Sequence, residues 1–435
     1  MMEKSGGTRG LGAVLACVAT LLPLPAGAQE SSYLAEARAA AAAAPRDATA
    51  QVALGDALLE AGLVSEARGV FAKASRLPEG SVPGTYGLAK VEMVREDIPA
   101  ARTHCQRLRG LSKGTPIGDV CEGYAFLAWK RGSRAGDALQ KALSTDPANV
   151  EALVGMGEVA QGLMNVADAE ASYRKALGIE AGNARAHLGL GKLYLAADRM
   201  REAEQELRQA VKLGPGLGEA RYQLGIVLGD TDEGIEQLRA AIEIRPGWGQ
   251  ALEALGQVLQ RKGQNEQAID VLTKATKAQP NLAGAFQYLG MAHVALKQWP
   301  EAEAALTEAI KLVPSLSQAV LALGDVQVQQ GHYDAALETL AKARDLSPRD
   351  AMISLHTGRV YRLMARNTQA RAQFVRASQL DPDLAASEVE LGDVFFELED
   401  WAQAREHYQA AKSRPNQEGV DPEHLKLRLE QLQGR

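Results

Sequence analysis

The stretch LGDVQVQQGHYDAALETLAKARDLSP, residues 323–348, decides the fold of this chain because its order of small and bulky residues recurs along the sequence. A glycine is followed twelve residues later by an alanine, then by a bulky leucine, a second alanine and a proline. Its glycine belongs to a column that repeats every 34 residues with one exception, and Ala89 fills one place of that column. The glycines of the column are Gly55, Gly123, Gly157, Gly191, Gly225, Gly256, Gly290, Gly324, Gly358 and Gly392. A period of this length is typical of solenoids.

The other columns describe how two helices meet in each unit. Small residues such as Ala336 and Ala343 allow the helix backbones to approach closely. A proline such as Pro348 stops the second helix and disfavours the helical conformation in the residue before it. The bulky column between the small ones reads Phe71, Cys105, Leu139, Tyr173, Leu207, Leu238, Leu272, Leu306, Leu340, Phe374 and Tyr408. Each unit is therefore predicted to be a pair of antiparallel helices.

This order resembles the tetratricopeptide repeat, whose motif is carried here by Leu323, Gly324, Ala336, Leu340, Ala343 and Pro348. Departures from the motif are mild, with Leu108 in a small place and Ala181 and Asn416 in proline places. The resemblance implies an all-α, right-handed superhelical solenoid of about eleven helix-turn-helix repeats over residues 48–419. The units start at residues 48, 82, 116, 150, 184, 218, 249, 283, 317, 351 and 385.

Both ends of the solenoid need a cover, because a terminal repeat otherwise exposes an apolar edge. Residues 29–47 contain an alanine-rich helix, from Tyr33 to Ala44, which we expect to cap the N-terminal repeat. Residues 420–435 contain a second capping helix, with Asp421 as its N-cap and Pro422 at its first position.

One unit, residues 218–248, has 31 residues and lacks part of the turn between its helices. The shortening could create a hinge in the stack. It could also be absorbed by an early end of the first helix at Gly229, and we favour this second interpretation.

The first 28 residues stand apart from the repeats. Lys4 and Arg9 precede an apolar stretch, and a small-x-small pattern ends at Ala28, which together indicate a secretory signal peptide. An exported bacterial protein, located in the periplasm, is the expectation. Two alternatives would place the chain on a membrane: an uncleaved leader used as an anchor, or lipidation at Cys17.

Export would leave two cysteines, Cys105 and Cys121, near the junction of adjacent units. Their helices pack together in a repeat stack, so an oxidising compartment could join them in a disulfide. Two buried thiols that fill apolar space are the other interpretation, and the sequence favours neither.

No pattern in the sequence indicates chemistry. The seven histidines never lie three or four residues apart, and the sequence contains no nucleophile elbow and no phosphate-binding loop. We therefore expect no catalytic residue, no metal and no cofactor. A net charge of −6, without long runs of one sign, gives no support for a nucleic-acid partner.

The remaining candidate for a functional site is the surface of the solenoid. The resemblance implies that the first helices line a concave groove through the second, fifth, ninth, twelfth and thirteenth places of each unit. The fifth places hold mostly apolar or tyrosine side chains, which predicts a largely apolar lining for an extended or helical peptide. The residues predicted to bind the partner are Tyr86, Met93, Tyr124, Leu127 and Tyr222. The alternative is that these tyrosines only pack the repeats together.

A second candidate spot is cationic. Arg359 and Arg362 lie one turn apart in a first helix and could hold an acidic side chain or a chain terminus, unless they are simply solvated. Asparagine is absent from every sixth place, which gives no support for a carboxylate clamp or for an asparagine ladder.

The sequence thus predicts a non-catalytic scaffold or adaptor of the bacterial cell envelope that holds a protein partner in its groove. The alternative is an accessory or regulatory subunit of an exopolysaccharide synthesis or export complex, or of a glycosyltransferase complex.

Overall fold

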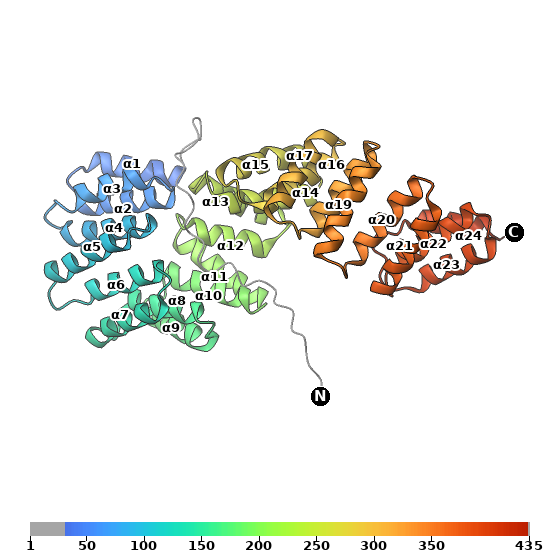
Figure 1. Cartoon of the computed structure of the whole chain (residues 1–435). Helices are drawn as coiled ribbons and strands as arrows, with labels where there is room; N and C mark the ends of the chain where they lie inside the picture. Colours follow the sequence, from blue (N-terminus) through green and yellow to red (C-terminus); the bar gives the residue numbers. More distant parts are fainter. Residues whose placement is uncertain (1–30, 434–435) are drawn as a thin grey trace. The chain divides into compact units, whose positions relative to one another are not determined.

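The computed structural model describes residues 31–433, which form 24 α-helices and no β-strand (Figure 1). The predicted leader lies outside the described residues. The chain divides into two compact units, residues 1–258 and 259–435, and each is described by itself. Within each unit the helices follow one another as antiparallel pairs, so the predicted all-α solenoid of helix pairs is confirmed.

The first unit contains a single helix, α1 (Ser32–Ala43), and six helix pairs. The pairs are α2 (Ala48–Glu60) with α3 (Val64–Ala74), α4 (Ser81–Val94) with α5 (Ile98–Leu111), α6 (Ile117–Ala128) with α7 (Gly132–Thr145), α8 (Val150–Gly162) with α9 (Val166–Ile179), α10 (Ala184–Ala196) with α11 (Met200–Leu213), and α12 (Gly218–Leu228) with α13 (Asp232–Ile244). The boundary between the units falls within α14 (Gly249–Arg261).

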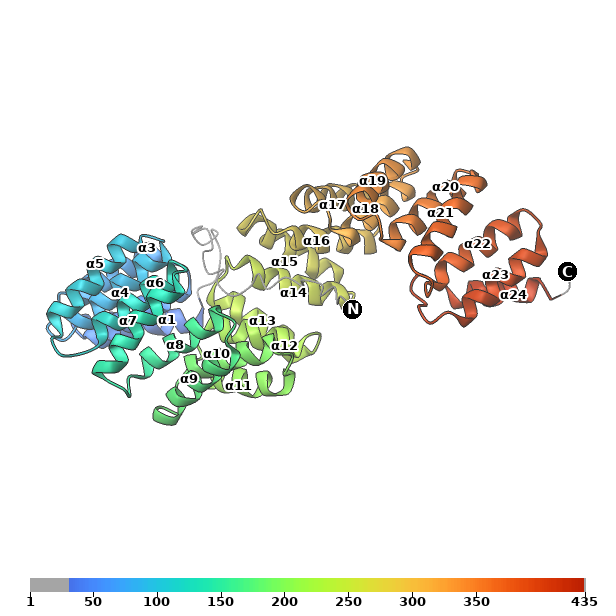
Figure 2. The same cartoon turned by 60° about the horizontal axis from the view of Figure 1, so that its bottom comes forward.

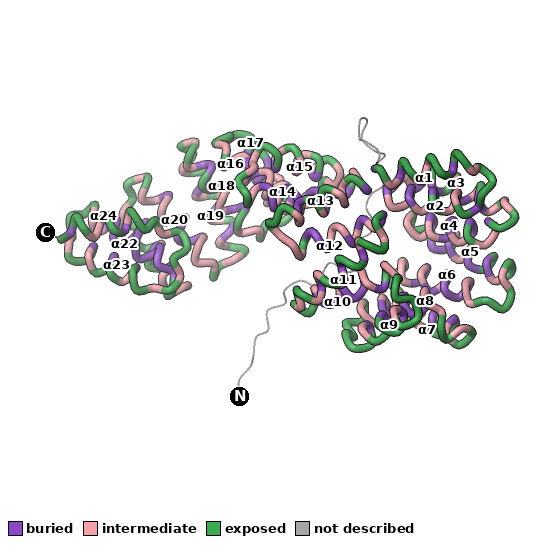
Figure 3. The backbone as a smooth tube through the Cα atoms, turned by 180° about the vertical axis from the view of Figure 1, so that it is seen from behind, coloured by how far each residue is buried: buried purple, intermediate pink, exposed green. Residues whose placement is uncertain are grey.

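The second unit continues the same alternation. Its helices are α15 (Asn265–Ala278), α16 (Ala283–Ala295), α17 (Trp299–Leu312), α18 (Ser317–Gln329), α19 (Tyr333–Leu346), α20 (Ala351–Leu363), α21 (Asn367–Leu380), α22 (Ala385–Glu397), α23 (Trp401–Ser413) and α24 (Pro422–Gln431). Figure 2 shows the succession of pairs from a second direction. Buried positions concentrate where helices face one another, and exposed positions lie on the outer faces and turns (Figure 3).

The glycine column is where the two helices of a pair approach most closely. A Cβ atom added to Gly290 would lie 2.5 Å from Cγ of Leu306, a fully buried residue of the bulky column. At two aromatic rings of this column, glycines contact the ring from two repeats: Gly55 and Gly87 at Phe71, and Gly157 and Gly189 at Tyr173. The second glycine of each pair occupies the sixth place of the following unit. The sixth place thus holds glycine at these junctions for a packing reason.

The turns between paired helices carry a backbone feature that the sequence does not announce. The residue two places after the first helix has a φ between +55° and +78° in ten repeats. Only three of these residues are glycine, and the set is Gly62, Glu96, Lys130, Met164, Asp198, Gly263, Lys297, Gly331, Ala365 and Glu399. Non-glycine residues accept this left-handed conformation at a cost because the packed helices leave the turn no alternative.

The short repeat has a local explanation. Helix α12 has 11 residues and ends at Leu228, where Gly229 takes a φ of +57°. Helix α13 begins three residues later, with the Thr231 hydroxyl accepting a hydrogen bond from the Gly234 amide. The early end of the first helix at Gly229, the favoured interpretation of the sequence, is confirmed.

Both ends of the described chain carry a capping helix. In α1, Leu34 is 1% exposed and packs on the first pair. Helix α24 begins at Pro422, and the Asp421 carboxylate accepts hydrogen bonds from the two amides that follow it, as predicted. Leu425 and Leu432 of this segment pack against the ring of Tyr408 and so cover the last repeat.

The close contact at Gly290 gives a direct test of the packing. Gly290→Ala should lower the free energy of unfolding by about 1–2 kcal/mol, because the overpacking cost exceeds the gain in helix propensity. Gly324→Ala is the matched control, since its added Cβ would lie 3.5 Å from Leu340 and fits without movement. That variant should be neutral or stabilised by up to about 1 kcal/mol. Calorimetric melting of both variants measures the difference, and equal shifts would contradict the packing model.

Candidate functional site

The first helices of successive repeats lie side by side in the first unit. Helices α2, α4, α6, α8, α10 and α12 contact one another in that order and present one continuous face. We call this face the first-helix wall. Its polar members occupy the second, ninth and thirteenth places of the units, and its tyrosines occupy the fifth and ninth: Asp56, Glu60, Tyr86, Lys90, Tyr124, Glu151, Glu158, Arg185, Lys192, Glu219 and Tyr222.

A hydrogen-bonded network centred on Glu151 joins four repeats of the wall. The Arg185 guanidinium lies 2.7 Å from the Glu151 carboxylate and 3.1 Å from the Glu158 carboxylate. The Tyr86 hydroxyl donates to the Glu151 carboxylate at 3.4 Å, and the Tyr124 hydroxyl donates to the Glu151 carbonyl at 3.0 Å. Burial raises the pKa of both tyrosines, so their hydroxyls remain protonated donors at neutral pH.

Ion pairs between consecutive repeats continue along the wall. Lys90 lies 2.8 Å from Asp56, and Lys192 lies 3.4 Å from Glu219. In each pair the lysine occupies the ninth place of its unit. Such partly exposed pairs contribute about 0–1 kcal/mol each, so they add more to specificity and register than to stability. The expectation of a largely apolar lining is wrong in the first unit, because the second and ninth places carry charges.

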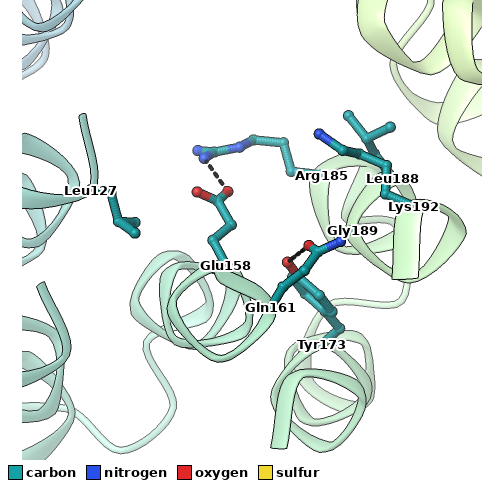
Figure 4. A pocket seen from close by; sticks show the side chains of 8 residues that line it. All are labelled: Leu127, Glu158, Gln161, Tyr173, Arg185, Leu188, Gly189 and Lys192. Carbon is teal, nitrogen blue, oxygen red and sulfur yellow. Dashed lines mark hydrogen bonds and ion pairs between the residues drawn. The ribbon is translucent and has the colours of Figure 1, made fainter. Parts of the chain in front are cut away.

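A pocket of about 130 Å³ opens in this wall (Figure 4). Leu127 and Leu188 supply apolar sides, and Glu158, Gln161, Arg185 and Lys192 supply polar groups, with Tyr173 and Gly189 completing the lining. The Tyr173 hydroxyl donates to the Gln161 side-chain oxygen at 3.2 Å. Pockets for small molecules usually measure about 300–1,000 Å³. This one has the size of a single side chain.

The structure places the predicted binding residues unevenly. Leu127 lines the pocket, and Tyr86 and Tyr124 belong to the Glu151 network. Tyr222 packs its ring 4.8 Å from that of Trp248, and burial raises its pKa to about 12. Met93 packs against the apolar cluster around Cys105. These tyrosines therefore pack the repeats together and are also part of the wall, so the two interpretations do not exclude each other.

The cationic spot requires a correction. Arg359 lies 2.5 Å from Glu390, and Arg362 lies 3.1 Å from Glu390 and 3.4 Å from Asp393. Asp393 is 3% exposed and also pairs with His424 and Arg428 of the capping helix. Both arginines are thus already neutralised by carboxylates of the next repeat. Their side chains, 30% exposed at Arg359 and 25% at Arg362, are neither freely solvated nor open to an acidic ligand.

A disulfide joins Cys105 of α5 to Cys121 of α6, with their Cα atoms 5.4 Å apart. Both residues are fully buried, and the bond links the second helix of one repeat to the first helix of the next. Arg109 and Lys141 form ion pairs with Asp119 beside this junction. The two repeats are thus held together by a covalent bond as well as by packing.

Sequence reasoning missed the charged members of the wall. Glu151, Glu158 and Arg185 stand in second and ninth places, which the repeat resemblance had marked as inward-facing. Glu253 stands in a fifth place, where the prediction rested only on the apolar and tyrosine residues. Reading every residue at these places, whatever its polarity, would have found them.

Two findings bear on other kinds of site. Within residues 31–433, no group of three or more histidine, cysteine, aspartate or glutamate side chains is arranged to hold a metal ion. Among the helices of that range, none combines the length and the apolar character that a membrane crossing needs.

Comparison with family models matches three segments of the chain. Residues 216–427 match the C-terminal domain of cilia and flagella-associated protein 70, a tetratricopeptide-repeat domain, and residues 34–81 and 161–224 match models of the tetratricopeptide repeat. A search of proteins with curated functions finds no match to this sequence.

Solved structures similar to this chain include the Cut9 and Hcn1 hetero-tetramer of APC/C, with 14% identity and a TM-score of 0.45 over 92% of each chain. Yeast Tom70 aligns with 13% identity and a TM-score of 0.41, over 88% of this chain and 94% of Tom70. YrrB, described as having an unusual peptide-binding site, aligns with 23% identity and a TM-score of 0.38, over 42% of this chain and 97% of YrrB.

Asp393 provides a test of the paired-arginine network. Asp393→Ala should lower the free energy of unfolding by about 3 kcal/mol, because it leaves partly buried cations without their carboxylate. Glu338→Gln is the control, since the Glu338–Lys342 pair is at least 70% exposed and its loss should leave stability unchanged. Denaturant titrations compare them, and an equally small effect of both variants would contradict the assignment.

Glu253 provides a pH test, because burial alone raises the pKa of its carboxyl. Its ionised form therefore costs stability above the unfolded pKa of about 4.3, and this cost is complete above the raised pKa of the folded state. Glu253→Gln should stabilise the chain at neutral pH, and this advantage should shrink as the pH falls through the raised pKa and be gone by about pH 4. Melting curves of the two proteins across this range show the trend, and a pH-independent difference would contradict it.

Proposed function

We propose that this chain, which belongs to the tetratricopeptide-repeat family, is a scaffold that binds a partner polypeptide on the first-helix wall of its first unit. Repeats of this family generally serve protein–protein interaction, and proteins built from them are typically non-catalytic. The fold alone does not determine the partner. The argument for binding therefore rests on the wall itself.

The pocket between α6, α8 and α10 is the observation that carries the proposal. Its volume suits one side chain, with Leu127 and Leu188 to contact an apolar group. Gln161 and Lys192 offer hydrogen-bonding groups beside it, and these suit the main chain of an extended segment. A row of anchors along a rigid wall is how grooves of stacked helices hold a peptide at a modest entropic cost.

Export to the bacterial periplasm is the second part of the proposal. The leader pattern of residues 1–28 supports it, and so does the disulfide, because such bonds persist mainly in oxidising compartments. An adaptor of the cell envelope, built of helix pairs and stapled between two repeats, is consistent with both features.

Site-specific photocrosslinking tests the wall. A photoreactive amino acid replaces Leu188 in the pocket, and the control replaces Lys175, which is exposed on α9. We expect polypeptides to be captured from envelope extract at Leu188 and not at Lys175. Capture of a glycosyltransferase or an export pore would favour the accessory-subunit role. Capture at Lys175 alone, or at neither position, would overturn the assignment of the wall.

The oxidation state of Cys105 and Cys121 tests whether the protein is exported to the periplasm. Protein isolated from the periplasmic fraction should yield a linked Cys105–Cys121 peptide under non-reducing conditions, and a form lacking residues 1–28 should remain in the cytoplasm with both thiols free. Recovery of the full-length chain only from the cytoplasm, with its leader intact, would contradict export.

A further inference from the structure

The first unit contains contacts between its two ends that a simple stack of repeats does not have. Figures 1 and 2 show α13 returning to the side of α1. The Arg245 guanidinium, at the end of α13, donates to the Glu60 carbonyl at 3.0 Å and lies 3.7 Å from the Glu60 carboxylate. The two residues are separated by 185 positions in the sequence. In a solenoid each repeat normally contacts only its neighbours.

Two more contacts join the same ends. The Ser32 amide, at the start of α1, donates to the Glu243 carboxylate at 3.5 Å. The ring of Tyr33 lies directly against Gly216, so closely that a Cβ at this glycine would collide with the ring. Gly216 belongs to the turn between α11 and α12. The contacts therefore connect α1 and α2 with the α11–α12 turn and with α13 at the far end of the unit.

We infer that these contacts form a latch that closes the first unit around its wall, and that opening of the latch controls access to the wall. The latch itself consists of contacts within this chain. Only the identity of the partner that reaches the wall rests on the proposed function. The latch consists of Tyr33, Glu60, Gly216, Glu243 and Arg245.

The latch is weak enough to open. Its central ion pair is partly exposed, with 21% of the Arg245 side chain and 33% of the Glu60 side chain accessible, and such pairs hold two elements only marginally. Burial raises the pKa of Glu60 although the nearby Arg245 lowers it, so the ion pair offsets only part of the cost of burying this carboxylate. The Arg245 guanidinium also lies 4.9 Å from the Trp248 ring, so it keeps a partner when the latch opens.

The latch contacts affect access to the first-helix wall. Glu60 lies on α2 and Glu219 on α12, at opposite ends of the unit, yet the Glu219 carboxylate is close enough to help raise the pKa of Glu60. The wall between them is therefore enclosed when the latch is shut. An extended chain end can reach an enclosed wall, whereas a bulky folded partner needs the latch open.

The closed state is tested by distance measurement in the exported full chain. Spin labels are attached to cysteines replacing Glu36 on α1 and Glu236 on α13, both exposed, while the native cysteines stay in their disulfide. The native latch should give a narrow short distance, and Arg245→Ala should add a longer, broader population. Arg208→Ala, which removes a surface ion pair of α11 with Glu233, is the control and should change nothing. Tyr33→Ala, which spares Arg245 and Trp248, should act like Arg245→Ala.

Access is tested by the reaction of a polyethylene-glycol maleimide with cysteine replacing Leu127 in the wall. Arg245→Ala should accelerate this reaction roughly tenfold, the factor for about 1.4 kcal/mol of latch energy. Cysteine replacing Lys175 should react at one rate in both backgrounds. Unchanged distances, or equal rates at Leu127 with and without Arg245, would overturn the latch. Because neither readout needs a partner, failed photocrosslinking would instead count against the proposed function.

Discussion

The close contact between a glycine of one helix and a bulky side chain of its partner is the constraint on which the structure depends. At Gly290 and Leu306, as at Gly157 and Tyr173, no space remains for even a Cβ atom. At these positions the interhelical distance is therefore set by the backbone itself, and most repeats share it, although Gly324 has room for a Cβ atom. Stacking then follows, because an aromatic residue such as Tyr173 is enclosed by glycines from two consecutive units. At Tyr173, the side chain that packs the two helices of one repeat together therefore also packs that repeat against the next one.

Charge plays a different role from packing in this chain. Along the first-helix wall, carboxylates and cations of neighbouring repeats pair with one another, as Glu158 does with Arg185 and Glu219 with Lys192. Each pair contributes little energy, yet together they leave few unpaired charges for a partner. Recognition on such a wall then depends on its apolar and hydrogen-bonding places, of which the pocket beside Leu127 is the clearest. The same pairing removes Arg359 and Arg362 from consideration as a binding spot.

The contacts of α1 and α2 with α13 span most of the first unit, whereas most other contacts join neighbouring repeats. A repeat stack accumulates small rotations, so its ends meet only if the number of repeats and the pitch agree. Here the short repeat, with α12 ending at Gly229, lies at the end that meets α1 and α2. A weak contact between the two ends of a flexible repeat stack can break without unfolding any repeat. The first unit therefore differs from a simple repeat stack through its latch contacts, which the repeat motif does not encode.

Sequence alone determined the repeat, the helix pairs, the capping helix that starts at Pro422 and the early end of α12, because these depend on local spacing, prolines and glycines. It also identified Leu127, Tyr86 and Tyr124 as members of the wall. It could not show that Arg359 faces Glu390, or that Arg245 reaches Glu60, because side-chain pairing between repeats depends on rotations that no single repeat encodes. The left-handed turns at residues such as Met164 and the joined Cys105 and Cys121 were likewise decided by tertiary structure, since packed helices impose the backbone path and bring the two sulfurs together.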